Sequence, residues 1–167
     1  RATSLDGADY RFVYVNATGT VAQRAITVTA NNASKVYGSS DPGLTYQVTS
    51  GNLVNNDQLS GALTRAAGEN VGAYGIGVGS LAANSNYIMT YVGSTFGITP
   101  ATLTYTADAA GRSYGDGNSP FSGTVTGFVN GDTLTSATTG TMAFNSPATA
   151  ASAVGQYQIN GSGLSAN

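Results

Sequence analysis

The sequence contains no cysteine, no histidine and no tryptophan. Without cysteine it has neither a disulfide framework nor a thiolate metal site, and without histidine it lacks the commonest general base and zinc ligand. Serine and threonine are plentiful, but no histidine and no cluster of carboxylates is there to activate a hydroxyl group. We therefore expect a protein that is not an enzyme, with no catalytic residues, no cofactor-binding residues and no cofactor.

Charge is also scarce, because Lys, Arg, Asp and Glu together make up only 8% of the 167 residues, against about 25% in an average globular domain. Lys35 is the single lysine and Glu69 the single glutamate. A net charge of -2 without a basic cluster argues against nucleic acid and anionic membrane surfaces as partners. No apolar run approaches the ~20 residues of a membrane-spanning helix, so we expect no membrane insertion of this segment.

The residues that are abundant are typical of strands and turns. Apolar residues alternate with threonine in residues 26–30 and again in residues 103–107, which indicates strands with one buried face. Asn-rich turns are expected at 55–57 and 130–132, and a Pro-Gly turn at 40–43. No segment has a helical stripe with caps, and residues 66–70 could form one helical turn at most. The fold class predicted is all-β, as tandem small β-sandwich or β-grasp-like modules arranged end to end.

An internal repeat with a period of about 77 residues organises the chain. Residues 26–30 align with 103–107, Tyr37-Gly38 with Tyr114-Gly115, and residues 10–15 with 87–92, each at an offset of 77. Further along, residues 71–76 align with 154–159, and Leu81 aligns with Leu164.

This alignment divides the chain into three parts. Residues 1–23 correspond to the closing strands of a preceding repeat, residues 24–100 to a complete repeat, and residues 101–167 to a following repeat that lacks its closing strands. We expect the sequence to be a window on a longer array. The linker around Pro100 is short and restricted in conformation, which predicts a stiff rod rather than a flexible string of modules.

Five segments in a fixed order resemble the MBG repeat, a module named for a mostly β-grasp-like fold. They are residues 35–46, 56–61, 64–74, Asn86-Tyr87 and the terminal Ile98-Thr99-Pro100. Residues 24–100 match closely, whereas residues 101–167 match more loosely. The resemblance implies secreted or outer-membrane-associated bacterial proteins, often filamentous-haemagglutinin-like adhesins exported by the two-partner route, in which such modules form stalks. It implies an extracellular or cell-surface location and no catalytic residues.

Three sets of residues are candidates for contacts. Tyr37 and Tyr114 occupy the same repeat position; they could stack on sugars, but core or inter-module packing is the favoured interpretation. Lys35 corresponds to Arg112, which favours a surface charge over a catalytic base. The acidic residues at turns could bind calcium, although they are isolated along the sequence and Asx-turn capping is favoured. These acidic residues are Asp41, Asp57, Asp116 and Asp132.

Three functions are compatible with these features. The first is a non-catalytic stalk of an adhesin, whose partners are the neighbouring repeats of the same chain. The second is a repeat unit of an extracellular filament or biofilm matrix fibre, in which copies join by strand complementation because the incomplete repeat exposes strand edges. The third is a carbohydrate-binding module that recognises a host or matrix glycan, or a protein.

Overall fold

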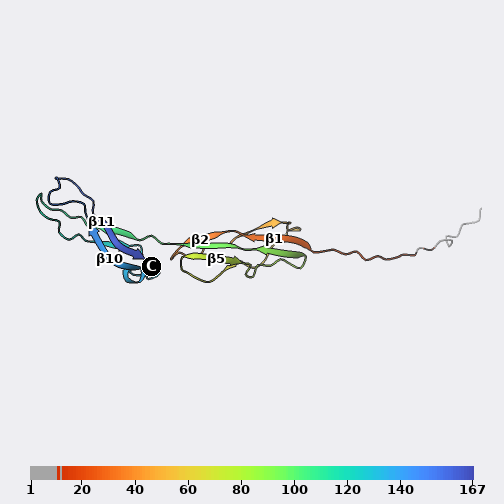
Figure 1. Ribbon diagram of the computed structural model, residues 1–167. Helices are drawn as coiled ribbons and strands as arrows, with labels where there is room; N and C mark the ends of the chain where they lie inside the picture. Colours follow the sequence, from red (N-terminus) through yellow and green to blue (C-terminus); the bar gives the residue numbers. More distant parts are fainter. Residues whose placement is uncertain (1–10, 12) are drawn as a thin grey trace, which may run out of the picture.

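The computed structural model describes residues 11 and 13–167 and shows two β-modules that follow one another along an elongated molecule (Figure 1). We call residues 24–100 the first module, residues 101–167 the second module and residues 13–23 the N-terminal segment. The N-terminal segment extends away from the first module, at the end opposite to the second module (Figure 1). Tyr10 and Phe12, expected on a closing strand, lie outside the described residues.

In the described part of the chain there are eleven strands and one short helix. In the first module they are β1 (Arg24–Ala30), β2 (Ala33–Val36), β3 (Tyr46–Ser50), β4 (Thr64–Arg65), β5 (Gly72–Gly77), β6 (Tyr87–Val92) and β7 (Ser94–Thr99). In the second module they are β8 (Thr104–Ala107), β9 (Gly123–Thr126), α1 (Leu134–Ala137), β10 (Thr138–Asn145) and β11 (Asn160–Ala166). The all-β fold class predicted from the sequence is confirmed.

The first module consists of two small sheets with strand orders β3-β1-β6 and β2-β7-β5-β4. The closing strands complete both sheets: β6 pairs parallel with β1, and β7 lies between β2 and β5. The alternation of apolar residues in β1 places Ile26, Val28 and Ala30 in the core. Phe96 of β7 and Val28 are the largest fully buried side chains, so the core depends on strands from both ends of the module.

The second module consists of two pairs of antiparallel strands. β8 pairs antiparallel with β9 as β1 does with β3, and β10 pairs antiparallel with β11. The rings of Tyr105 in β8 and Phe144 in β10 pack edge to face, with their centres 6.1 Å apart. Of the ten buried apolar side chains among the described residues, Phe144 is the one that lies in the second module. Its core is therefore much more open than that of the first module.

Several local expectations need correction. A helical turn, α1, forms at Leu134–Ala137, where none was expected, because Thr133 and Ser136 form a reciprocal capping box. The chain turns at Tyr37-Gly38 rather than at 40–43, with the Ser39 amide donating to the Val36 carbonyl at 3.0 Å.

The Asn-rich turns form as predicted. Asn55, Asn56 and Asn130 have left-handed φ angles of 56°, 60° and 54°. The Asp57 amide closes the first turn onto the Val54 carbonyl, and the Asp132 amide closes the second onto Val129, both at 2.9 Å. The two modules therefore present the same kind of turn at the same repeat position.

Candidate functional site

The first module shows what its closing strand β7 contributes. β7 runs parallel to β2 on one side, with Ala33 opposite Phe96 and Lys35 opposite Ile98. On the other side it runs antiparallel to β5, with Tyr74 opposite Phe96. Removal of β7 would leave β2 and β5 without a common partner and would expose the centre of the core.

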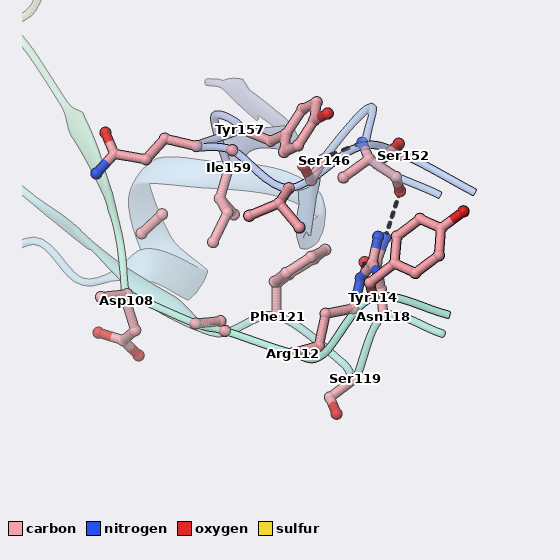
Figure 2. Close-up of a pocket in the computed structure, with 18 of the residues that line it drawn as sticks. Asp108, Arg112, Tyr114, Asn118, Ser119, Phe121, Ser146, Ser152, Tyr157 and Ile159 are labelled. Carbon is pink, nitrogen blue, oxygen red and sulfur yellow. Dashed lines mark hydrogen bonds between the residues drawn. The ribbon is translucent and has the colours of Figure 1, made fainter. Parts of the chain in front are cut away.

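The second module has this arrangement without the central strand. The counterparts of β2 and β5 are residues 110–113 and 155–159, and neither forms a strand. A cavity of about 590 Å³ lies between them, and Phe121 and Ile159 point into it from opposite sides (Figure 2). We call this space the slot. Residues 154–159 align with 71–76, most of which lie in β5, yet residues 155–159 form no strand and have no neighbouring strand at this position.

The slot does not arise from a misaligned repeat. In the first module the Tyr74 hydroxyl donates to the carbonyl of Asn70, four residues earlier, at 2.7 Å. In the second module the Tyr157 hydroxyl donates to the carbonyl of Ala153, again four residues earlier, at 2.9 Å. The same local hydrogen bond fixes both segments, so 155–159 is the structural counterpart of β5.

A charged cluster covers one end of β7 in the first module. Asp41 accepts from Arg65 Nε at 2.5 Å and from Lys35 Nζ at 2.7 Å, and Glu69 also binds both cations. The Lys35 and Arg65 side chains are only 5% and 11% exposed, and the Arg65 guanidinium carbon lies 4.9 Å from the centre of the Phe96 ring. The interpretation of Lys35 as a free surface charge therefore needs correction; Lys35 is a half-buried member of this cluster, and its side chain is covered by its ion-pair partners.

In the second module, one cation that is hydrogen-bonded to uncharged groups takes the place of this cluster. Arg112 stands at the Lys35 position and Asn118 at the Asp41 position. Arg112 Nε donates to Asn118 Oδ1 at 2.8 Å, Arg112 also donates to the Thr149 carbonyl, and Asn118 Nδ2 donates to the Ala148 carbonyl at 2.7 Å. Both Arg112 and Asn118 line the slot (Figure 2). The sequence analysis did not predict this hydrogen-bond network. The exchange of Asp41 for Asn118, like that of Lys35 for Arg112, can be read from the alignment at the offset of 77.

Acidification is expected to destabilise the first module between about pH 4 and about pH 2. Hydrogen bonds from Arg65 and then Lys35 lower the pKa of Asp41 from 3.8 to about 2, and hydrogen bonds from Lys35 and then Arg65 lower the pKa of Glu69. Because these pKa values are depressed in the folded state, the stabilisation is complete above the unfolded values and disappears as the pH falls through the folded ones. Urea unfolding followed across this range by module-resolved hydrogen exchange measures the effect.

The matched control for this pH dependence is the Asp41→Asn variant, which copies the Asn118 position of the second module. Its first module should be less stable at neutral pH and should change less with pH below about pH 4. A wild-type first module whose stability does not fall over this range would contradict the role of the cluster.

A second group of residues joins the two modules, and we call it the junction. The Tyr37 hydroxyl donates to Asp132 Oδ2 at 3.0 Å, across 95 positions of sequence. Beside it, Gly38 has φ +85°, and a Cβ atom there would lie 2.5 Å from Cγ2 of Val129. The structure thus places Tyr37 in an inter-module contact and packs the glycine backbone directly against the second module.

The corresponding residues of the second module face solvent. Tyr114 is 70% exposed and lies at the rim of the slot (Figure 2). Gly115 has a similar φ of +92°, and nothing lies within 4 Å of where its Cβ would be. The junction surface of the first module therefore recurs, uncovered, at the far end of the second module.

Three of the four acidic residues at turns have side-chain partners in the protein, whereas for Asp116 the structure shows a backbone hydrogen bond from its amide to the Ser113 carbonyl. Asp57 Oδ2 accepts from the Tyr87 hydroxyl at 2.9 Å, Asp132 accepts from Tyr37, and Asp41 belongs to the charged cluster. No three acidic residues come together as a metal-ligand group within residues 11 and 13–167. In the same part of the chain, no helix is long and apolar enough to cross a membrane.

Comparison with known proteins identifies the module. A family model described as the MBG domain of the YGX type matches residues 26–97 and again residues 103–167, and each range contains a Tyr-Gly pair. The chain belongs to the MBG domain family. No curated protein and no solved structure matches it. The resemblance noted from the sequence is confirmed, in two tandem copies.

MBG domains are typically non-catalytic repeat modules associated with extracellular surface proteins. In this chain the slot and the junction are both consequences of the tandem MBG repeat. The slot lies at the position that β7 occupies in the first module, and the junction shows how one MBG module meets the next.

Proposed function

We propose that these MBG modules form the structural, non-catalytic stalk of a secreted or cell-surface bacterial adhesin. The observation that carries the proposal is the junction, because Tyr37 and Gly38 of one module contact Asp132 and Val129 of the next. The linker between β7 and β8 consists of residues 100–103 and contains Pro100. A short linker together with a side-chain contact restricts the angle between modules, which is what a projecting stalk requires.

Tandem arrays of residues 24–100, displayed between a surface anchor and a ligand-binding tip, provide the test. For a stiff stalk, the distance at which the tip reaches its ligand is expected to rise in proportion to the number of modules. A flexible string would give a distance that rises with the square root of that number, and this result would contradict the stalk.

The same experiment needs a control for binding by the modules themselves. Arrays without the tip should give no signal above background on a glycan array or on matrix proteins. A reproducible signal would favour the carbohydrate-binding alternative instead.

A second candidate function is the repeat unit of an extracellular fibre that assembles by strand complementation. A strand added between residues 110–113 and 155–159 would fill the slot, whether it came from the same array or from another chain. A stalk and a fibre would both use the junction, but only the fibre needs contacts between separate chains.

A further inference from the structure

Strand β6 of the first module forms an open sheet edge. In the sheet order β3-β1-β6, β6 has β1 as its single neighbour. The Arg24 amide donates to the Asn86 carbonyl at 2.8 Å, and alternate residues of a parallel strand bond to the same neighbour. The even-numbered residues of β6 therefore bond to β1, and Met89 and Tyr91 turn their N–H and C=O groups outward. Nothing in the part of the chain that the structure describes pairs with these groups.

This edge lies along the side of the molecule. β1 follows the long axis of the molecule (Figure 1), and β6 is parallel to β1. The second module continues along the same axis (Figure 1), and further modules in line would also leave the side of β6 uncovered. The edge therefore belongs to the complete module, whatever the number of repeats before and after it.

β6 has none of the features that normally protect an outer strand from pairing. Charged side chains, bulges and very short strands are the usual protections. Each of the other three outer strands has one: β2 contains Lys35, the pairing of β3 with β1 is irregular between Thr27 and Val28, and β4 has two residues. β6 has six residues, with no charge, no proline and no glycine. It is the unprotected edge of the first module.

The outer face of β6 is complementary to a second copy of itself. Ile88 and Val92 are 55% and 45% exposed, and Thr90 between them is exposed as well. In an antiparallel pair of β6 strands centred on Thr90, Ile88 of each copy lies opposite Val92 of the other. The same register places Met89 opposite Tyr91, so their outward backbone groups exchange hydrogen bonds. The Ile–Val pairs then occupy the positions without hydrogen bonds, where opposed side chains come closest.

We propose that two copies of the chain pair side by side through β6, as antiparallel strands centred on Thr90. The pairing would join two three-stranded sheets into one continuous sheet of six strands. It would satisfy the outward N–H and C=O groups of Met89 and Tyr91 in both copies, and neither copy has to open or give up a strand. The contact is two-fold and closed, because each copy uses the same edge.

The direction of the pairing indicates where the two copies lie. Because β6 follows the long axis, antiparallel β6 strands make the two molecules point in opposite directions. Stalks on one surface point the same way and cannot pair in this manner, whereas stalks on two facing surfaces can. This step rests on the proposed stalk function. It makes the partner a second copy on a facing cell, and the contact a homotypic one between cells.

Self-association of the 167-residue chain is the first test. The average mass, measured by sedimentation and light scattering, is expected to rise with concentration toward twice that of the single chain. Ile88→Arg copies Arg11, which stands at the same position of the preceding repeat. It should keep the chain monomeric, because an arginine would replace one member of each apolar pair. A wild-type chain that is monomeric at all concentrations would overturn the proposal.

Two variants separate the pairing from a general effect of charge. Val71→Arg is the matched control, because Val71 is 53% exposed and precedes Gly72, which pairs with Ile98 at the end of β7 away from β6. It should leave the dimer unchanged. Ile88→Arg/Val92→Glu should recover part of the dimer, since each arginine would lie opposite a glutamate. Dimers that persist in Ile88→Arg, or that Val71→Arg also abolishes, would overturn the role of β6.

The register can be tested with a single cysteine, in a chain that has none of its own. Thr90→Cys should form a disulfide-linked dimer under mild oxidation, because the two Cα atoms at this position would lie about 4.5 Å apart. Thr27→Cys is the control. Thr27 lies beside Thr90 on β1, and its two copies would be three strand spacings apart, about 14 Å. Equal cross-linking of the two variants would contradict the register.

Hydrogen exchange reports on the edge itself. The amides of Thr90 and Val92 bond to β1 in the single chain and should exchange slowly at any concentration. Those of Met89 and Tyr91 should exchange quickly in dilute solution and become protected as the dimer forms. Protection of Met89 and Tyr91 that does not change with concentration would mean that the chain covers this edge by itself, and would overturn the proposal.

Beads that carry the chain through its C-terminal residue test the contact between facing surfaces. Wild-type beads should aggregate, and Ile88→Arg beads should stay dispersed even when mixed with wild-type beads. A chain that dimerises in solution but does not aggregate beads would overturn the contact between facing surfaces. A monomeric chain would overturn the pairing but not the stalk, because the dependence of reach on the number of modules is measured separately.

Discussion

Replacement of Phe96 by alanine should remove a large part of the stability of the first module. The Phe96 side chain is fully buried, and truncation of a buried phenylalanine to alanine typically costs about 3–5 kcal/mol. A domain of this size has a total unfolding free energy of about 4–12 kcal/mol. The loss should be at the upper end of the range because the Arg65 guanidinium packs 4.9 Å from the Phe96 ring centre. Loosening β7 would also disturb the charged cluster.

The matched control is Phe121→Ala in the second module. Phe121 is half-buried and lines a cavity that already exists, so its removal enlarges an open space rather than creating a closed one. We expect less than about half the cost of Phe96→Ala. Module-resolved hydrogen exchange in urea measures both variants in the same chain. Equal losses in the two modules would mean that the second module is as well packed as the first.

The repeat was the feature that sequence analysis could establish most firmly. The Asn-rich turns were predicted because Asn tolerates left-handed φ angles, and β1 and β8 because apolar residues alternate along them. Both depend on neighbouring residues, so they can be recognised without knowledge of the tertiary structure.

Features that depend on distant partners could not be predicted in the same way. Lys35 looked like a surface charge, because only the fold brings Asp41 and Glu69 to its ammonium group. Residues 155–159 form no strand although they align with most of β5, because strand formation requires a neighbouring strand as well as a suitable sequence. The slot itself is visible only when both segments are placed in space. The contact of Tyr37 with Asp132 spans 95 positions and was equally out of reach.

The junction gives the second large expected effect, in the variant Gly38→Ala. A Cβ atom at residue 38 would lie 2.5 Å from Cγ2 and 2.6 Å from Cβ of Val129, and both atoms would have to move. We expect the second module to separate from the first and the Tyr37–Asp132 hydrogen bond to break. Small-angle scattering should then show a broad distribution of inter-module angles, and hydrogen exchange at residues 129–132 should rise toward that of an exposed turn.

The Gly115→Ala variant is the control, because it has the cost of a left-handed alanine without a clash at the junction. Residues 38 and 115 have similar left-handed φ angles of +85° and +92°, so alanine pays a similar penalty of about 1–2 kcal/mol at either position. Because nothing lies near Gly115, its replacement should leave the inter-module angle unchanged. The double variant Gly38→Ala/Val129→Gly should restore that angle in part. Val129→Ala in place of Val129→Gly would not suffice, because the Cβ atom of residue 129 also clashes with the added Cβ atom of residue 38. If Gly38→Ala and Gly115→Ala gave the same scattering profile, the modules would not be held by this junction, and the stiffness of the stalk would depend on the Pro100 linker alone.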